Sequence, residues 1–309
     1  MTLNVSLPPG DPQALVSEVL GDFLADCRMR NLSARTVEWY SDTLCRLLGP
    51  LLDLPLASVG LAEIRASLSR LLDGRSPATV NGFVRAVKAF LNWATKEEFL
   101  VRADPRRIAR LKEPQRIPPT LTVEQIKAIL SAPKRNTFLG LRDHTCMALM
   151  LDTGVRLGEV RGLLATDVSI PFAKVRGKGD KERTVALSPP MQSHMRRYLR
   201  ARQVALTQAD VETPYLFPSR MGAQLSAKRV HELVVGYARK AGLEGLRVSP
   251  HVFRYTFATH FLRNGGSIVA LQQILGHTTL AMSRRYAAIF DADVWESSMA
   301  LSPLVGLRL

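Results

Sequence analysis

The sequence predicts a mainly α-helical protein of two domains with one small β-hairpin. Apolar residues recur at intervals of three and four along most of the chain, which is the period of amphipathic helices. A segment rich in proline and charge interrupts this pattern once, and β-branched residues flank one glycine-rich turn. The chain has 309 residues, 46% of them hydrophobic, which suits two folded domains with separate cores rather than a disordered protein.

The first domain is predicted at residues 11–111. Helical apolar spacing runs through ALVSEVLGDFLADCRMR, TVEWYSDTLCRLLGPLL and NGFVRAVKAFLNWATKEEFL, so we expect a bundle of four or five helices. Residues 112–121 follow as a linker, because two adjacent prolines cannot continue a helix. Thr122 is then a candidate N-cap, with Gln125 at the capping-box position.

The second domain is predicted at residues 122–290. Gly154 is expected to end one helix, and Arg156 to begin the next. The segment DVSIPFAKVRGKGDKERTVALS is expected to form the hairpin, with Gly-Lys-Gly-Asp as its turn. Further helices are expected at residues 191–206 and 226–241, from Ser249-Pro250 to Gly265-Gly266, and around Tyr286, before a C-terminal tail at residues 291–309.

The net charge of +15 is carried mostly by the second half of the chain. Up to residue 118 there are 16 basic and 13 acidic residues, and after it there are 26 basic and 14 acidic ones. Such a surplus indicates a polyanionic partner, either nucleic acid or an anionic membrane surface. No apolar run approaches the roughly 20 residues that span a bilayer, which argues against a membrane protein.

The cysteines and the N-terminal segment predict a cytoplasmic protein. Cys27, Cys45 and Cys146 are odd in number and far apart, without metal-ligand spacing, so we expect reduced and mostly structural thiols. The segment MTLNVSLPPGD has neither a basic n-region nor a long apolar stretch, so no signal peptide is expected.

Two short motifs carry charged residues whose spacing suggests chemistry. Arg156 and Glu159 lie three residues apart in DTGVRLGEVRG and share a helix face, but such a pair is usually a solvent-exposed ion pair. Lys178 lies at the hairpin tip in RGKGDKERT, where a lysine is usually only a solubilising charge. A hairpin tip can also deliver an ammonium group to a phosphate oxygen. The spacing of a phosphate-binding P-loop is absent.

Two later motifs add histidine, arginine and tyrosine. His251 and Arg254 lie three residues apart at the start of a helix, where the partial positive charge of the helix end favours an anion. His277 follows a glycine, and Tyr286 comes nine residues later in LGHTTLAMSRRYAAI. A tyrosine there is usually a half-buried aromatic residue, yet its phenolic oxygen is also a nucleophile.

Other site classes lack the residues that they need. No cysteine, carboxylate or second histidine has metal-ligand spacing around any of the six histidines, so no metal site is expected. The converging carboxylates of two-metal phosphoryl transfer are missing, and so is the Gly-x-Ser-x-Gly elbow of serine hydrolases.

The motifs, in their order along the chain, resemble the tyrosine recombinase family, also called the phage integrase or Xer type. They are TGVRLGEV, GKGDKER, HVFRYTFATHFL and LGHTTLAMSRRY, and they cover most of residues 140–290. The resemblance implies a tyrosine-recombinase catalytic domain at residues 122–290. It also implies that residues 11–111 form a helical, SAM-like core-binding domain, which clamps the opposite side of the DNA.

The resemblance further implies a site-specific recombinase that cleaves and rejoins duplex DNA without metal, ATP or another cofactor. The reaction would pass through a covalent 3′-phosphotyrosine intermediate and a Holliday junction. Tyr286 would attack phosphorus, and Arg156 and Arg254 would stabilise the charge on the non-bridging oxygens. The remaining roles would be those of His251 as proton acceptor or hydrogen-bonding partner, Lys178 as proton donor to the leaving 5′ oxygen, His277 as donor to a non-bridging oxygen, and Glu159 as support.

The implied partner is a double-stranded DNA recombination site, bound by a homotetramer or together with a related recombinase. The C-terminal tail would dock on a neighbouring subunit, or it is only a frayed end. The basic residues that we expect to contact DNA are Arg85, Lys88, Arg176, Lys181, Arg183, Arg284 and Arg285.

Two positions depart from the family pattern. Tyr255 follows Arg254 where many relatives have histidine, and we interpret it as a packing residue or a hydrogen-bond donor to phosphate. Lys181 lies three residues from Lys178, but alignment on Gly-Lys-Gly favours Lys178. Two alternative functions stay open: a type IB topoisomerase, whose usual sequence signature differs, and a DNA-binding protein without catalysis.

Overall fold

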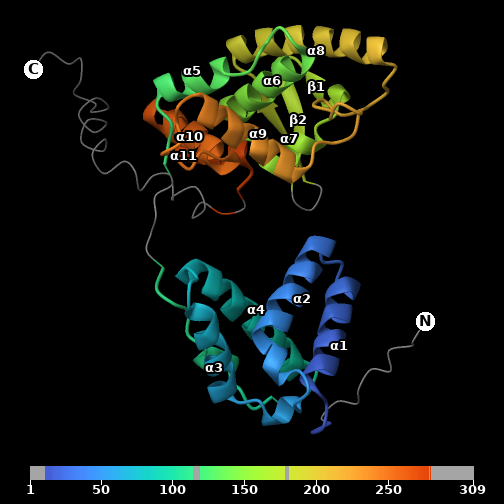
Figure 1. Cartoon of the computed structure of the whole chain (residues 1–309), viewed down its shortest axis with the longest axis vertical. Helices are drawn as coiled ribbons and strands as arrows, with labels where there is room; N and C mark the ends of the chain where they lie inside the picture. The colour runs from blue at the N-terminus through green and yellow to red at the C-terminus, as the bar shows by residue number, and fades with distance from the viewer. Residues whose placement is uncertain (1–10, 100, 114–118, 178–180, 278, 280–309) are drawn as a thin grey trace, which may run out of the picture. The chain divides into compact units, whose positions relative to one another are not determined.

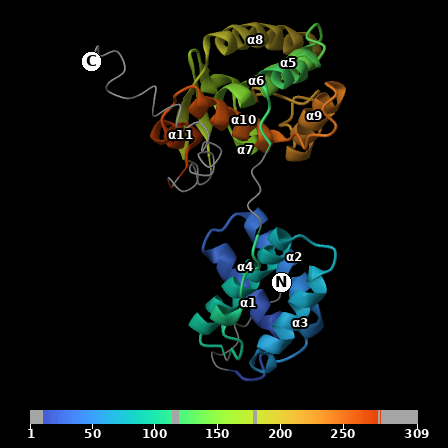
Figure 2. The same cartoon turned by 90° about the vertical axis from the view of Figure 1, so that its left-hand side faces the viewer.

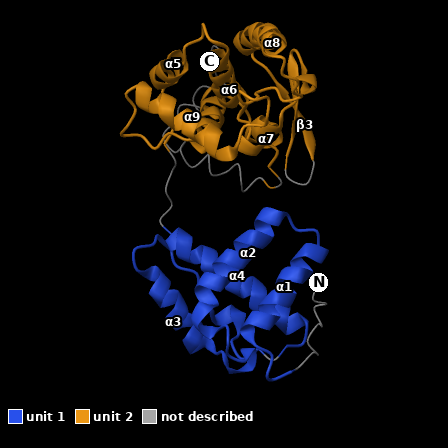
Figure 3. Cartoon of the chain, turned by 45° about the vertical axis from the view of Figure 1, so that its right-hand side comes forward, with its two compact units in different colours: residues 1–115 blue, residues 116–309 orange. Residues whose placement is uncertain are grey.

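The computed structural model describes residues 11–99, 101–113, 119–177, 181–277 and 279. The chain divides into two compact units, residues 1–115 and residues 116–309 (Figure 3). The division lies within the segment that the sequence predicts as a linker. Each unit has a hydrophobic core of its own.

The first unit is a bundle of helices (Figure 1). α2 packs against α1, α3 and α4, and α4 also contacts α1 and α3. The bounds are Val16–Met29 for α1, Ala34–Leu48 for α2, Leu61–Leu72 for α3 and Pro77–Lys96 for α4, with short 3-10 turns at Gly49–Leu51, Leu56–Ser58 and Pro105–Arg107.

Local sequence explains both the helix starts and the core of this unit. Ser33 caps α2 and Ser76 caps α4, each accepting a hydrogen bond from the backbone three residues on. Pro77 occupies the first turn of α4, where its missing N–H costs nothing. The apolar faces of the helices meet around Phe23, whose ring lies 5.2 Å from Tyr40, 5.4 Å from Trp93 and 5.7 Å from Phe90 between centroids.

The second unit combines helices with a small antiparallel sheet. Its helices are α5 (Val123–Ser131), α6 (Phe138–Thr153), α7 (Leu157–Gly162), α8 (Pro189–Ala209), α9 (Ala227–Lys240), α10 (Pro250–Arg263) and α11 (Ile268–Leu275), with a 3-10 turn at Ala165–Asp167. The expected N-caps Thr122 and Ser249 are confirmed, because Thr122 accepts from Gln125 and Ser249 accepts from Val252. The sequence did not distinguish α11 as a separate helix.

α6 lies at the centre of this unit, between α8 and α10 (Figure 1, Figure 2). Every residue of α6 from Gly140 to Met150 is buried, including the polar Arg142, Asp143 and His144, so this helix has no solvent-facing side over these residues. α6 ends at Gly154, whose φ of 64° is in the left-handed region. The chain then turns directly into α7.

The sheet has three strands in the order β1-β2-β3, so the predicted hairpin gains one short strand. The strands are β1 (Val168–Ser169), β2 (Phe172–Arg176) and β3 (Glu182–Ala186). Ala173 pairs with Val185 and Val175 pairs with Arg183, so these four side chains share the core-facing side of the sheet. This mainly helical fold with a small sheet confirms the predicted fold class. Among the described residues, none of the helices has both the length and the apolar character needed to cross a membrane.

Candidate active site

Arg156 is positioned by the junction between α6 and α7. A Cβ atom at Gly154 would lie 2.4 Å from Cδ1 of Phe257, so only glycine fits this turn. Arg156 then begins α7 as its N-cap, as the sequence predicts. Its backbone N–H donates to Oε2 of Glu159 at 2.7 Å, which satisfies one of the unpaired amides at the helix start.

Glu159 is buried, with only 3% of its side chain exposed, and its Oε1 accepts from Nη1 of Arg156 at 2.9 Å. The pair is therefore not the solvent-exposed ion pair that its spacing alone suggests, because Arg183 from β3 and the backbone of Gly177 lie against the carboxylate. Burial by itself raises the pKa of the Glu159 carboxyl. Hydrogen bonds and charge from Arg183 and Arg156 outweigh the burial and lower that pKa to about 2.

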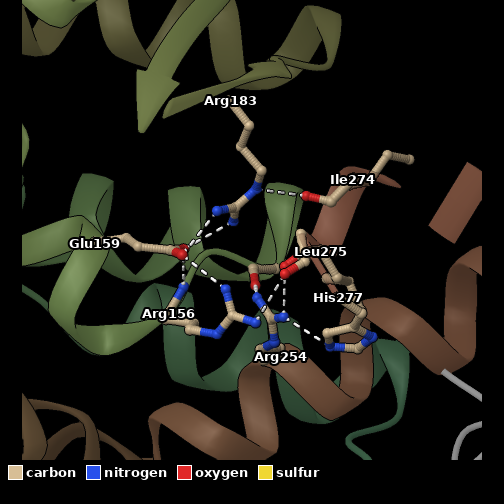
Figure 4. A network of polar contacts seen from close by, with 9 residues as sticks. Arg156, Glu159, Arg183, Arg254, Ile274, Leu275 and His277 are labelled. Carbon is tan, nitrogen blue, oxygen red and sulfur yellow. Dashed lines mark hydrogen bonds and ion pairs between the residues drawn. The ribbon is translucent and has the colours of Figure 1, made fainter. Parts of the chain in front are cut away.

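Arg183 provides a second guanidinium on the same carboxylate (Figure 4). Its Nη1 donates to Oε1 of Glu159 at 2.7 Å, its Nη2 donates to Oε2 at 2.8 Å, and its Nε donates to the carbonyl of Ile274 at 2.8 Å. The sequence placed Arg183 among the DNA contacts, but the structure directs it inward. The sequence contains a signal for this position: Arg183 lies two residues before the buried Val185, and residues two apart in a strand share one side of the sheet. Arg183 therefore belongs to the core-facing side of β3.

Arg254, from α10, is 6% exposed and joins three parts of the unit. Its Nη1 donates to the carbonyl of Gly154 at 2.6 Å, and its Nη2 donates to the carbonyl of Leu275 at 2.8 Å. Nη2 also lies 3.0 Å from Nε2 of His277. Because arginine only donates, Nε2 of His277 is the acceptor in this contact.

The C-terminal end of α11 brings the three arginines together. Three successive carbonyl groups there accept hydrogen bonds, each from a different guanidinium (Figure 4). The negative end of the helix dipole favours cations at this place. The pairs are Ile274 with Arg183, Leu275 with Arg254, and Gly276 with Arg156, the last at 3.3 Å.

This arrangement is suited to binding an anion. Arg156 and Arg183 share the carboxylate of Glu159, and Arg254 adds a third guanidinium beside them, so the described network has a net positive charge. Arg156, whose side chain is 38% exposed, is the most accessible of the three. Donors held by such contacts stabilise charge that develops on a reacting oxygen without having to reorganise.

The phage integrase family matches residues 119–293. The chain belongs to this family of tyrosine-type site-specific recombinases. A tyrosine recombinase XerC from Myxococcus xanthus is 32% identical over 247 residues, covering 79% of this chain and 81% of the relative. A tyrosine recombinase XerD from Ralstonia nicotianae is 33% identical over 216 residues, covering 69% of each.

Solved recombinase structures share the fold. The crystal structure of the XerH site-specific recombinase bound to palindromic difH substrate matches with a TM-score of 0.73 and 20% identity, covering 93% of this chain and 84% of XerH. The crystal structure of XerA recombinase matches with a TM-score of 0.53 and 27% identity, covering 93% of this chain and 99% of XerA. The predicted family is therefore confirmed.

The other residues of the predicted site have different surroundings or lie outside the described chain. His251 is exposed in the first turn of α10, three residues before the buried Arg254. Tyr255 is half-buried and packs against a cluster of Ala258, Leu271 and Leu275, in keeping with a packing role. Lys178 and Tyr286 lie outside the described residues.

The residues predicted to contact DNA have different surroundings. Arg85 is exposed, with its guanidinium 5.9 Å from the centroid of the Trp39 ring. Lys88 is half-buried and donates to the carbonyl of Ile108 at 3.2 Å, which draws its charge toward the protein. Lys181 is exposed, and Arg176 forms ion pairs with Asp167 at 3.3 Å and Glu182 at 3.1 Å. Arg284 and Arg285 lie outside the described residues.

Among the described residues, no group of three or more histidine, cysteine, aspartate or glutamate side chains could hold a metal ion. The charged side chains of the site are hydrogen-bonded to one another and to backbone carbonyls. Glu159 is the only carboxylate to which Arg156 and Arg183 are hydrogen-bonded within the described part of the chain.

Proposed function

We propose that this recombinase cleaves and rejoins duplex DNA by transesterification through Tyr286. The observation that carries the proposal is the meeting of Arg156, Arg254 and His277 at the end of α11, with His277 nine residues before Tyr286 in the sequence. Two arginines held in place can bind a phosphodiester through its non-bridging oxygens. They stabilise the charge that develops there during attack.

In the proposed reaction, every bond broken and every proton moved is accounted for without an added cofactor. The phenolic oxygen of Tyr286 attacks phosphorus, a 3′-phosphotyrosine bond forms, and the bond to the 5′ oxygen breaks. His251 takes up the phenolic proton or orients it by a hydrogen bond, and Lys178 supplies a proton to the leaving 5′ oxygen. A 5′ hydroxyl from the partner strand then reverses the attack and forms a Holliday junction.

The proposed partner is a double-stranded recombination site bound by several protein copies. The excess of basic over acidic residues after residue 118 favours a polyanion. Matching structures include XerH bound to difH substrate and a lambda integrase dimer bound to a COC′ core site. We infer that this chain acts as a tetramer, alone or with a related recombinase, and that residues 291–309 contact a neighbouring copy.

The test is the capture of a covalent protein–DNA adduct. A library of nicked duplexes with randomised sequence is incubated with the full chain, and adducts that survive detergent are recovered and sequenced. We expect enrichment of one site, an adduct with the wild type, and none with Tyr286→Phe. Loss of the adduct in Tyr255→Phe with retention in Tyr286→Phe would overturn the choice of nucleophile.

A second measurement separates the alternative functions. Supercoiled plasmid without the enriched site is incubated with the protein, and its topoisomers are resolved on a gel. We expect no relaxation. Relaxation that is independent of sequence would show a topoisomerase, and binding of DNA without any adduct would show a DNA-binding protein without catalysis.

A further inference from the structure

Arg183 lies in β3 and reaches the site through the core-facing side of the sheet. We infer that Arg183 is a positioning residue for strand cleavage, which holds Glu159 and the end of α11 so that Arg156 and His277 meet the phosphate. The inference rests on the proposed function, because it concerns the same site. The contacts of Arg183 distinguish it from the other basic residues of the hairpin.

All the donor nitrogens of Arg183 have a partner inside the protein. Nη1 and Nη2 form a two-pronged contact with Glu159 at 2.7 and 2.8 Å, and Nε donates to Ile274 at 2.8 Å (Figure 4). The side chain is 14% exposed. A two-pronged guanidinium–carboxylate contact sets both distance and orientation, which a single point charge does not. This geometry suits a structural clamp better than a phosphate contact.

The same carboxylate orients Arg156. Oε1 of Glu159 accepts from Nη1 of both arginines, and Oε2 accepts from Nη2 of Arg183 and the backbone N–H of Arg156. Four hydrogen bonds thus occupy the acceptor capacity of the carboxylate. Without Arg183, half of these bonds are lost at a side chain that is 3% exposed.

Arg183 also connects elements that are distant in sequence. It holds the Ile274 carbonyl, one residue before the Leu275 carbonyl that Arg254 holds. A Cβ at Gly276 would lie 3.2 Å from Cδ of Arg183, so the turn before His277 packs on this side chain. At the base of the hairpin, a Cβ at Gly177 would lie 3.5 Å from Oε1 of Glu159, and Lys178 follows Gly177 in the chain.

The charges that face Glu159 determine how the site responds to pH. Arg156 from α7 and Arg183 from β3 contact the carboxylate, and Arg254 and His277 lie next to them in the network. Burial raises the pKa of Glu159, and Arg183 is the first of the groups that lower it. Removing Arg183 therefore raises that pKa, so that Glu159 becomes protonated as the solution is acidified.

The experiment compares Arg183→Met, Arg183→Lys and the matched control Lys174→Met. Lys174 is a basic residue of the same hairpin, ion-paired with Glu182 at 2.9 Å on the outer side of the sheet. Two quantities are measured on the enriched nicked duplex: the rate of adduct formation and the binding affinity. The pH range is about 5 to about 8, which lies above the ordinary pKa of a glutamate.

For Arg183→Met we expect the rate at neutral pH to fall about 100-fold, as expected for a misplaced catalytic group. The affinity changes less than about threefold, which is under 1 kcal/mol. The rate falls further with acidification, whereas the wild type, with its Glu159 pKa of about 2, shows no such loss from this group. Arg183→Lys keeps a charge beside Glu159 and restores the wild-type pH profile but not the full rate. Lys174→Met behaves as the wild type.

Several outcomes would overturn the inference. One is a wild-type rate and pH profile in Arg183→Met. Another is weakened binding with a salt slope reduced by about 1 and an unchanged rate in the bound complex, which would mean a direct phosphate contact. If Arg183→Met does not fold, Arg183→Lys carries the test, and a wild-type rate there overturns the inference. A wild type that forms no adduct contradicts the proposed function itself.

Discussion

The two compact units differ in where their charged side chains lie. Among the described residues of the first unit, the buried polar side chains are the uncharged Thr43, Ser67 and Asn81. The second unit buries charged side chains, namely Arg142, Asp143, Glu159, Arg202 and Arg254. The charges of the first unit remain near water, while part of the excess positive charge of the second unit is enclosed.

This difference separates a unit held by apolar packing from one that also depends on paired charges. A buried charge is expensive unless hydrogen bonds compensate it. Arg142 is paired with Asp143 at 2.6 Å, Arg202 donates to the carbonyls of Thr213 and Tyr215, and Arg254 donates to carbonyls at the ends of two helices. The second unit therefore loses more stability than the first when one polar partner is removed.

The largest expected effect is that of Glu159→Gln. The substitution leaves two arginines without their carboxylate, and we expect the second unit to lose about 4 kcal/mol of unfolding free energy, as when a buried ion pair is broken. Hydrogen exchange of the α7 and β3 amides, followed by mass spectrometry, measures this loss for the second unit alone.

Glu63→Gln is the matched control in the first unit. Glu63 is also the third residue of a helix, and its Oε2 accepts from the backbone N–H of Gly60 at 2.9 Å, but it is exposed to solvent. We expect much smaller changes in the exchange of α3 amides. Equal losses in the two units would contradict the contrast between them.

The second-largest expected effect is a loss of folding stability at low pH. The folded-state pKa of Glu159 is lowered from 4.5 to about 2. Its contribution is therefore fully present above about pH 4.5 and is lost as the pH falls toward about 2. The shift corresponds to about 3 kcal/mol. Urea unfolding of the wild type and Glu159→Gln at several pH values measures the difference in stability, and a difference that does not shrink on acidification would exclude this linkage.

The smallest effect compares two glycines that both have positive φ. Gly154 has φ of 64° and Gly74, in the first unit, has φ of 72°, but only at Gly154 would an added Cβ meet other atoms within 4 Å. Alanine is strained at both positions, and Gly154→Ala adds overpacking against Phe257. We expect Gly154→Ala to be more destabilising by about 2 kcal/mol. Thermal unfolding of both variants measures the difference in stability. Equal destabilisation would show that α10 moves away from the added Cβ without loss of stability.

Local patterns in the sequence were sufficient for most of the fold. The three-and-four spacing in residues 14–30 and 81–100 predicted helices, and the structure has α1 and α4 there. Thr122, Gly154 and Ser249 predicted helix boundaries because capping and left-handed turns depend on residues next to each other in the chain. β1 and α11 were missed, since two strand residues and eight helical residues are too short for a clear period.

The sequence also indicated which residues are candidates for the site. The order and spacing of Arg156, Arg254 and His277 indicated the family, which the match over residues 119–293 then confirmed. What the sequence did not indicate was which charges are buried. The spacing of Arg156 and Glu159 alone suggested a solvent-exposed pair, and Arg183 was expected on DNA, because spacing within one element says nothing of what packs on it.

The tertiary structure alone decided how the charges combine. β3 lies against α11, and α7 lies against β2, so Arg183 meets a carboxylate 24 residues earlier in the chain and a carbonyl 91 residues later. Partners so distant in sequence leave no local period or motif. The sequence by itself determined which helices form and which residues can do the chemistry. Packing determined that Glu159 and the end of α11 hold the arginines in place, because only burial makes their hydrogen bonds strong enough to fix a geometry.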